Sequence, residues 1–242
     1  LSSADRLSIG SDTIKFLSSD SDGHEDPDEI IEDITDAVIT GLADYCRKSG
    51  IKRIVLGLSG GIDSAVAACV ACAAVGSSNV LGIAMPSRFS SQHSIDDAKY
   101  TAEALGIEFK IEPIDGMHSA LEGRIGEILD SGNPVASENI QSRLRGIIVM
   151  AHANAQNRMA IATGNKSELA QGYCTLYGDM AGGFTPLGDL YKMQVYALAE
   201  VFNQRAKTLE KPPPINQSTL TKPPSAELAP DQKDEDSLPP YE

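Results

Sequence analysis

The chain of 242 residues contains no apolar run of the roughly 18 residues that a membrane-spanning helix needs. The longest candidate, residues 64–75, has 12 residues and is rich in alanine. The sequence also lacks the basic start and apolar middle of a secretory signal. We therefore expect a protein with no membrane partner.

Cysteine is scarce as well, and the whole chain has only Cys46, Cys69, Cys72 and Cys174. Four cysteines do not make a disulfide scaffold in a chain of this size, so the cytoplasm is the expected compartment. Cys69 and Cys72 have the spacing of a redox or metal pair. They lie inside an Ala-rich helical run without a second ligand pair, and we expect them to be two buried small side chains.

A cluster of basic residues is also missing. The formal net charge is −14. Residues 1–36 hold 11 acidic and 2 basic side chains, and residues 210–242 hold 7 acidic and 3 basic side chains. The long stretch between these two segments is therefore nearly neutral. Because a nucleic-acid backbone is bound by clustered Lys and Arg, we expect no nucleic-acid partner.

Composition divides the chain into three parts. Residues 1–25 are rich in Ser and Asp with few large apolar groups, which predicts a flexible acidic leader. Residues 26–209 are enough for one α/β domain. Residues 210–242 are charged and rich in proline, which predicts a C-terminal arm without regular structure. The first residue is Leu1, and we expect the sequence to be a piece of a longer protein.

Short apolar runs alternate with helical periods through the middle part. This alternation predicts a mostly parallel sheet with right-handed crossovers and helices on both faces, a three-layer, Rossmann-like α/β sandwich. We expect strands at residues 53–58, 80–85, 108–114 and 159–163. We expect helices at residues 26–50 with Asp26 as the cap, then at 64–75, 94–105, 117–130, 137–157 and 191–205, and a Gly-rich loop at 172–190.

The segment Ser59-Gly60-Gly61-Ile62-Asp63-Ser64 follows the first of these strands, at the sheet edge where ligands of parallel α/β folds bind. Two glycines let the backbone approach a ligand, and the N–H groups of a helix start hold phosphate. Asp63 would repel a phosphate unless Mg²⁺ lies between them, and Mg²⁺ favours one or two carboxylates with phosphate oxygens. The alternative is a Gly-Gly turn with a serine cap. The Gly-Lys-Ser/Thr of a Walker A loop is absent.

The same segment resembles the pyrophosphate loop of the N-type ATP pyrophosphatases, which split ATP between the α and β phosphates. Five further segments resemble NAD synthetases in the same order along the chain, and most of all the synthetase half of the glutamine-dependent enzymes. They are Met85–Ser91, Glu138–Arg143, Thr163–Glu168, Tyr177–Phe184 and Lys222–Leu228.

This resemblance implies an adenine-nucleotide alpha-hydrolase-like fold and an AMP-forming ligase of NAD biosynthesis. Such an enzyme adenylates the nicotinate carboxylate of deamido-NAD⁺ with Mg·ATP and releases pyrophosphate, and ammonia then displaces AMP. A carboxylate is a poor acyl acceptor because its leaving group would be oxide, whereas AMP leaves readily. The protein mostly positions reactants and neutralises phosphate charge. The resemblance also implies a homodimer.

The resemblance assigns roles to individual residues. Asp63 and Lys192 are implied to be catalytic, and Asp63 and Glu168 to bind Mg²⁺. Deamido-NAD⁺ binding is implied for Asn139, Arg143, Glu168 and Asp179. ATP binding is implied for Gly57, Leu58, Ser59, Gly60, Gly61, Ile62, Asp63, Ser64, Thr163, Lys192 and Ser225.

The sequence departs from the glutamine-dependent pattern at both ends. We expect the glutaminase domain to be missing from this chain, which leaves ammonia as the immediate nitrogen donor, although a full-length protein could carry that domain at its N-terminus. Family members usually continue beyond residue 242, so we expect a truncated arm. Two alternatives stay open, a tRNA thiolase-like adenylating enzyme and a non-catalytic nucleotide-binding module. The missing basic patch weighs against the first, and the two candidate metal carboxylates weigh against the second.

Overall fold

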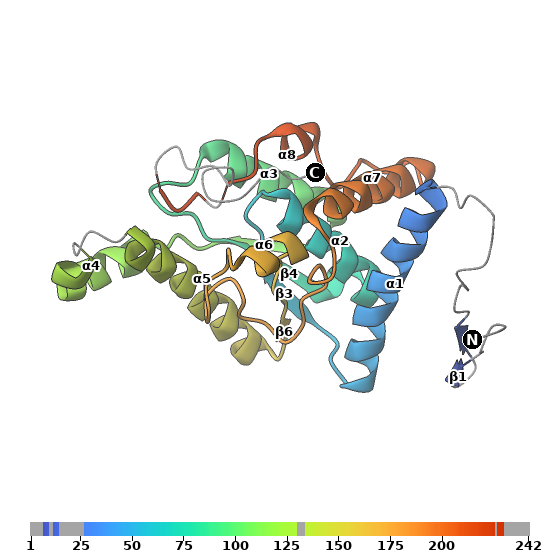
Figure 1. The fold of residues 1–242 in the computed structure, drawn as a ribbon, viewed down its shortest axis with the longest axis horizontal. Coiled ribbons are helices and arrows are strands. Elements are labelled where there is room, and N and C mark those ends of the chain that lie inside the picture. The colour runs from blue at the N-terminus through green and yellow to red at the C-terminus, as the bar shows by residue number, and fades with distance from the viewer. Residues whose placement is uncertain (1–6, 10–11, 15–26, 130–133, 226, 230–242) are drawn as a thin grey trace. The chain divides into compact units, whose positions relative to one another are not determined.

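The computed structural model describes residues 7–9, 12–14, 27–129, 134–225 and 227–229 (Figure 1). The chain divides into two units, residues 1–30 and residues 31–242. In the first unit, β1 (Leu7–Ile9) and β2 (Asp12–Ile14) pair as an antiparallel hairpin. Composition predicted no strand there, because the β-branched residues of these two short segments are diluted by Ser and Asp. The other residues of the predicted leader, and the predicted cap Asp26, lie outside the described residues.

The second unit is built on a parallel sheet of four strands in the order β5-β4-β3-β6. Its strands are β3 (Ile54–Gly57), β4 (Val80–Ala84), β5 (Glu108–Ile111) and β6 (Met159–Ala160). All five residues of β4 are buried, as expected for a strand covered on both faces.

Helices cover both faces of this sheet, which confirms the predicted three-layer α/β architecture. Side chains of β3 alternate between two apolar clusters, because neighbouring residues of a strand point to opposite faces. The longer helices are α1 (Pro27–Lys48), α2 (Ile62–Val75), α3 (Gln92–Leu105), α4 (Asp115–Leu129), α5 (Pro134–Gln156) and α7 (Lys192–Thr208). Ile54 and Leu56 pack with α1, α2, α3 and α7, whereas Val55 packs with α5.

The predicted order of elements is confirmed, but the strands are shorter. β6 ends at Ala160, and beyond it Ile161 makes a single parallel bridge with Phe184 of the Gly-rich loop. Thr163 is therefore in a loop beyond the strand. No helix of the described residues combines the length and apolar character that would let it cross a membrane.

Three short helices were not predicted. They are the 3₁₀ turn η1 (Ser77–Asn79), α6 (Lys166–Gln171) and α8 (Gln217–Thr221). Local caps account for the last two, since Asn165 and Glu168 form a reciprocal capping box and the Asn216 side chain accepts from the Thr219 N–H. The prediction of an arm without regular structure is thus wrong for residues 217–221, and residues 226 and 230–242 lie outside the described residues.

Candidate functional site

A cavity of about 370 Å³ lies at the carboxyl ends of β3, β4 and β6. This is the edge where ligands of parallel α/β sheets bind. The end of β4, the helix α5, the Gly-rich loop and the segment after α8 contribute to its lining. Of the predicted site residues, the lining includes Gly57, Leu58, Ser59, Gly61, Ile62, Asp63, Ser64, Thr163, Glu168, Asp179, Lys192 and Ser225.

The phosphate loop, Ser59–Ser64, joins β3 to α2 and is held by its own serines. The Ser64 Oγ accepts from the Ser59 N–H at 3.2 Å and donates to the Gly61 carbonyl at 3.0 Å. The Ser59 Oγ accepts from the Gly61 N–H at 3.2 Å. Gly61 is the cap of α2 and has no side chain to occupy the first N–H groups of the helix. Those groups carry the positive end of the helix dipole, so the loop suits an anion.

Gly60 gives this loop its turn, although it is outside the described cavity lining. Its φ is +82°, in the left-handed region that favours glycine. A Cβ placed on Gly60 would lie 2.1 Å from the carbonyl oxygen of Ser94, at the start of α3. The phosphate loop and α3 are therefore in backbone contact at a point where only glycine fits.

Asn165 joins the two predicted metal carboxylates. Its Nδ2 donates to Asp63 Oδ1 at 2.8 Å, and its backbone N–H donates to Glu168 Oε2 at 3.1 Å. The other oxygen of Asp63 accepts from Lys192 Nζ at 2.5 Å. Lys192 is only 2% exposed, so its ammonium needs this anionic partner. Two segments that are more than a hundred residues from Asp63 in sequence thus converge on it.

The chemistry of these donors fits a Mg²⁺ ion that enters together with phosphate. No described group of three or more His, Cys, Asp or Glu side chains is arranged to hold a metal. Asp63 and Glu168 nevertheless face one cavity, and Mg²⁺ usually takes one or two carboxylates and completes its shell with water and substrate phosphates. The pair therefore suits a nucleotide-borne ion better than a cage made of protein alone.

The predicted acceptor residues divide into two groups. Asp179 lines the cavity and accepts from the Thr175 N–H at 2.9 Å and from Ser142 Oγ at 2.9 Å. Asn139 and Arg143 are outside the described lining and brace the Gly-rich loop. Asn139 Oδ1 accepts from Thr175 Oγ1 at 2.7 Å, and Arg143 Nε donates to a loop carbonyl at 3.2 Å.

Arg145 is a cavity residue that sequence reasoning missed. Its Nε donates to the Met85 carbonyl at 3.0 Å, beside the end of β4. Burial lowers the pKa of the Arg145 guanidinium, and the nearby Glu227 carboxylate partly offsets this shift. The helical period of α5 could have indicated this position. Arg145 is four residues from both Gln141 and Val149, which are buried, whereas Arg143 is on the exposed face.

The cysteines give no sign of a nucleophile or a redox pair. All four are free. Cys69 is buried as expected, whereas Cys72 is only partly buried. Burial raises the pKa of Cys69 and raises that of Cys72 to about 11, so both are neutral thiols at physiological pH. Cys174 lines the cavity, but burial and the Asp179 and Glu168 carboxylates raise its pKa as well.

Comparison with known proteins gives a family. Residues 34–242 match the family model described as NAD synthase. The glutamine-dependent NAD(+) synthetase of Rhodobacter capsulatus is 49% identical over 220 residues, which cover 89% of this chain and 40% of the relative. That of Aquifex aeolicus is 48% identical over 212 residues, which cover 87% of this chain and 36% of the relative. The chain thus spans well under half the length of these curated relatives.

Solved structures with a similar fold are synthetases as well. The glutamine-dependent NAD⁺ synthetase of Acinetobacter baumannii in complex with ADP superposes with a TM-score of 0.75 at 36% identity, over 82% of this chain and 37% of that one. The NMN synthetase of Francisella tularensis superposes with a TM-score of 0.72 at 32% identity, over 85% of this chain and 80% of that one. The NH₃-dependent NAD synthetase of Campylobacter jejuni superposes with a TM-score of 0.65 at 33% identity, over 74% of this chain and 76% of that one. With the family model matching all but the first 33 residues, this chain belongs to the NAD synthase family.

Proposed function

We propose that this chain carries out the ATP-dependent amidation of deamido-NAD⁺ to NAD⁺. The observation that carries the proposal is the convergence of the phosphate loop, two carboxylates and a buried lysine on one cavity. Family membership supports the same reaction class. The described cavity offers cations and N–H donors for phosphate, as expected for a reaction that depends on positioning.

The proposed reaction has two steps. An oxygen of the nicotinate carboxylate attacks the α-phosphorus of ATP, the bond to the bridging oxygen breaks, and pyrophosphate leaves. The nitrogen of ammonia then attacks the acyl carbon, the bond to AMP breaks, and one proton is released with the amide and AMP. Free ammonia is the proposed immediate donor, and the longer relatives named glutamine-dependent support a glutaminase partner domain in the full-length protein.

The residues of this chain have proposed roles in the first step. The phosphate loop holds the triphosphate, and Lys192 balances the charge that grows on the departing pyrophosphate. Thr163 and Ser225 contact ATP. Asp63 and Glu168 hold Mg²⁺, which supplies neutralisation of phosphate charge when bound. Both carboxylates are kept in place by Asn165, so their spacing is set before the nucleotide arrives.

The acceptor half of the site is proposed with separate roles for its residues. Asp179 and Glu168 reach the cavity and are proposed to contact deamido-NAD⁺ there. Asn139 and Arg143 are retained as candidates for the outer part of the same ligand, with their contacts to the Gly-rich loop setting its position. The cytoplasm remains the proposed compartment, supported by four free cysteines.

Pyrophosphate release tests this function directly. In ammonium buffer with Mg·ATP, we expect release that depends on deamido-NAD⁺ and yields NAD⁺ and AMP in equal amounts. Nicotinate mononucleotide is the matched second acceptor, because one structural neighbour is named an NMN synthetase. Release with the mononucleotide alone would transfer the proposal to that smaller acceptor. Unchanged ATP with both acceptors would contradict an amidating role and favour a nucleotide-binding module.

We also propose a homodimer that uses an exposed apolar surface on α5 and the Gly-rich loop. Ile147 is 59% exposed on α5, and Tyr177 is 84% exposed on the loop that Arg143 fastens to this helix. Exposed apolar side chains grouped in this way are typical of protein interfaces. At micromolar concentration, sedimentation should give the mass of two chains. The Ile147→Asp variant should sediment with the mass of one chain. The control variant Ile128→Asp, at an exposed position on α4, should keep the mass of two chains. A wild-type mass of one chain would contradict the dimer.

A further inference from the structure

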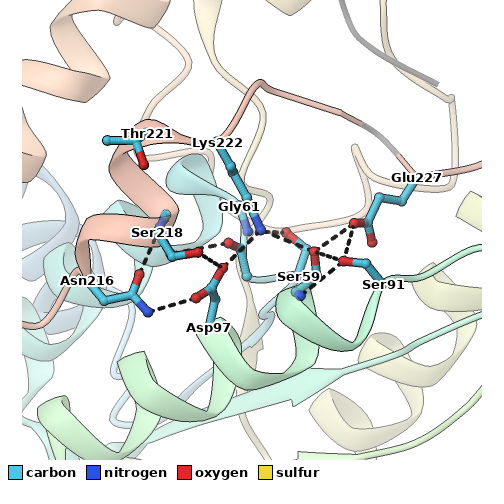
Figure 2. A network of polar contacts seen from close by, with 12 residues as sticks. Ser59, Gly61, Ser91, Asp97, Asn216, Ser218, Thr221, Lys222 and Glu227 are labelled. Carbon is cyan, nitrogen blue, oxygen red and sulfur yellow. Dashed lines mark hydrogen bonds and ion pairs between the residues drawn. The ribbon is translucent and has the colours of Figure 1, made fainter. Parts of the chain in front are cut away.

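A buried carboxylate outside the cavity lining ties the C-terminal part of the chain to α3 (Figure 2). Asp97 is on α3 and is 4% exposed. Its two oxygens accept from Asn216 Nδ2 at 2.7 Å, Ser218 Oγ at 3.2 Å and Lys222 Nζ at 3.2 Å. A buried carboxylate is destabilising unless donors surround it, and here the three side-chain donors named above come from one distant segment.

The same segment has a second attachment to α3. Glu227 Oε1 accepts from Ser91 Oγ at 3.0 Å and from Ser94 Oγ at 2.7 Å, and Ser91 is the cap of α3. Lys222 Nζ also donates to Ser94 Oγ at 3.1 Å, which links the two attachments. We call residues 216–225 and 227–228 the strap.

Between its attachments the strap passes over the phosphate loop. Thr219 Oγ1 donates to the Gly60 carbonyl at 3.5 Å, a long contact. Lys222 and Ser225 line the cavity together with the loop. On its far side the strap reaches α5, where Gln141 Nε2 donates to the Leu228 carbonyl at 2.8 Å. The position of the strap therefore decides which groups face a bound phosphate from this side.

We infer that Asp97 is a positioning residue for the nucleotide. It fixes the strap over the phosphate loop and orients Lys222, whose ammonium then adds to the positive charge that a polyphosphate meets. Asp97 acts through Lys222 and the strap and does not itself line the cavity. The inference rests on the proposed function to the extent that the polyphosphate is Mg·ATP.

Calorimetric binding of Mg·ATP without acceptor tests this role in the full chain. Asp97→Asn places an amide donor opposite the Asn216 and Lys222 donors, and we expect its Kd for Mg·ATP to rise about tenfold. In turnover assays KM for ATP should rise likewise, with kcat within about twofold. Asp96→Asn is the matched control, because the Asp96 carboxylate is on the same helix but is exposed, and it accepts from Gln92 Nε2 at 2.9 Å.

Two further variants test the inference if Asp97→Asn does not fold. Lys222→Met should give the same loss of affinity, whereas Lys99→Met, an exposed lysine on α3, should give none. Because part of the effect of Asp97 passes through Lys222, the loss of affinity in the Asp97→Asn/Lys222→Met double variant should be smaller than the sum of the two single losses. Hydrogen exchange of Asp97→Asn should be faster in the strap and unchanged in β3 and α2.

Wild-type affinity in both Asp97→Asn and Lys222→Met would overturn the inference. So would additive losses in the double variant, or faster exchange throughout β3 and α2, since these would show a general structural role. A wild-type chain that binds Mg·ATP but releases no pyrophosphate contradicts the proposed function alone, because the positioning role is measured by binding.

Discussion

Asp63→Asn is expected to reduce deamido-NAD⁺-dependent pyrophosphate release by about a thousandfold, since it removes the carboxylate proposed to hold the metal against the triphosphate. The same change is expected to lower the free energy of unfolding by about 3 kcal/mol. Lys192 is 2% exposed and its ammonium is bonded to Asp63, so the variant leaves a buried charge facing an amide. Turnover measurements and chemical denaturation check the two effects separately.

A double variant distinguishes the two roles of Asp63. Adding Lys192→Met removes the buried ammonium that Asp63 balances, so Asp63→Asn/Lys192→Met should recover most of the lost stability while activity stays at its low level. Mn²⁺ binding in the presence of ATP, followed by electron paramagnetic resonance, should weaken in both variants. Near-normal turnover of Asp63→Asn with Mg²⁺ would contradict the metal role, and an unchanged unfolding free energy would contradict the importance of the ion pair.

Gly60→Ala is expected to have the second-largest effect, on stability and on nucleotide affinity together. The new Cβ would lie 2.1 Å from the Ser94 carbonyl oxygen and 2.8 Å from the Ser94 carbonyl carbon, both backbone atoms. Left-handed strain of about 1 kcal/mol adds to an overpacking penalty of about 2 kcal/mol, for a total of about 3 kcal/mol. The loop or the start of α3 must shift, so Mg·ATP affinity should fall at least about tenfold.

Gly50→Ala is the matched control for this prediction. Gly50 has φ +70°, close to that of Gly60, but a Cβ there meets nothing within 4 Å. It should therefore lose only the strain of about 1 kcal/mol and keep wild-type Mg·ATP affinity. Equal destabilisation of the two variants in denaturant would contradict the claim that contact with Ser94 makes Gly60 necessary.

The parts of the fold that sequence reasoning predicted are those with a local signal. The buried strands are apolar runs, the longer helices have a regular apolar period, and the phosphate loop is a compact motif between the two. Their order fixes the parallel sheet and places the loop at the ligand edge. The cavity position of Asp63 follows from that placement, whereas Thr163 was implied only by the resemblance to NAD synthetases.

What sequence reasoning missed depends on contacts between distant segments. Helical period separates Arg143 from Arg145 on α5, but the packing of α5 beside the end of β4 decides that Arg145 reaches the cavity. The strap was expected to have no regular structure because proline and charge dominate its composition. Its order comes from Asp97 and Glu227, whose partners are more than a hundred residues away. No periodicity reports such a pairing.

The attachment of the strap to α3 has a consequence for how the protein is made. Ser94 and Glu227 are 133 residues apart, so this closure is among the least local contacts in the chain. During synthesis the sheet and the phosphate loop emerge from the ribosome well before residues 216–228, and domains start to fold as they emerge. In a nascent chain the nucleotide site would therefore stay open on the side of α3 until residues 216–228 emerge, after the sheet, the phosphate loop and Lys192 are already in place.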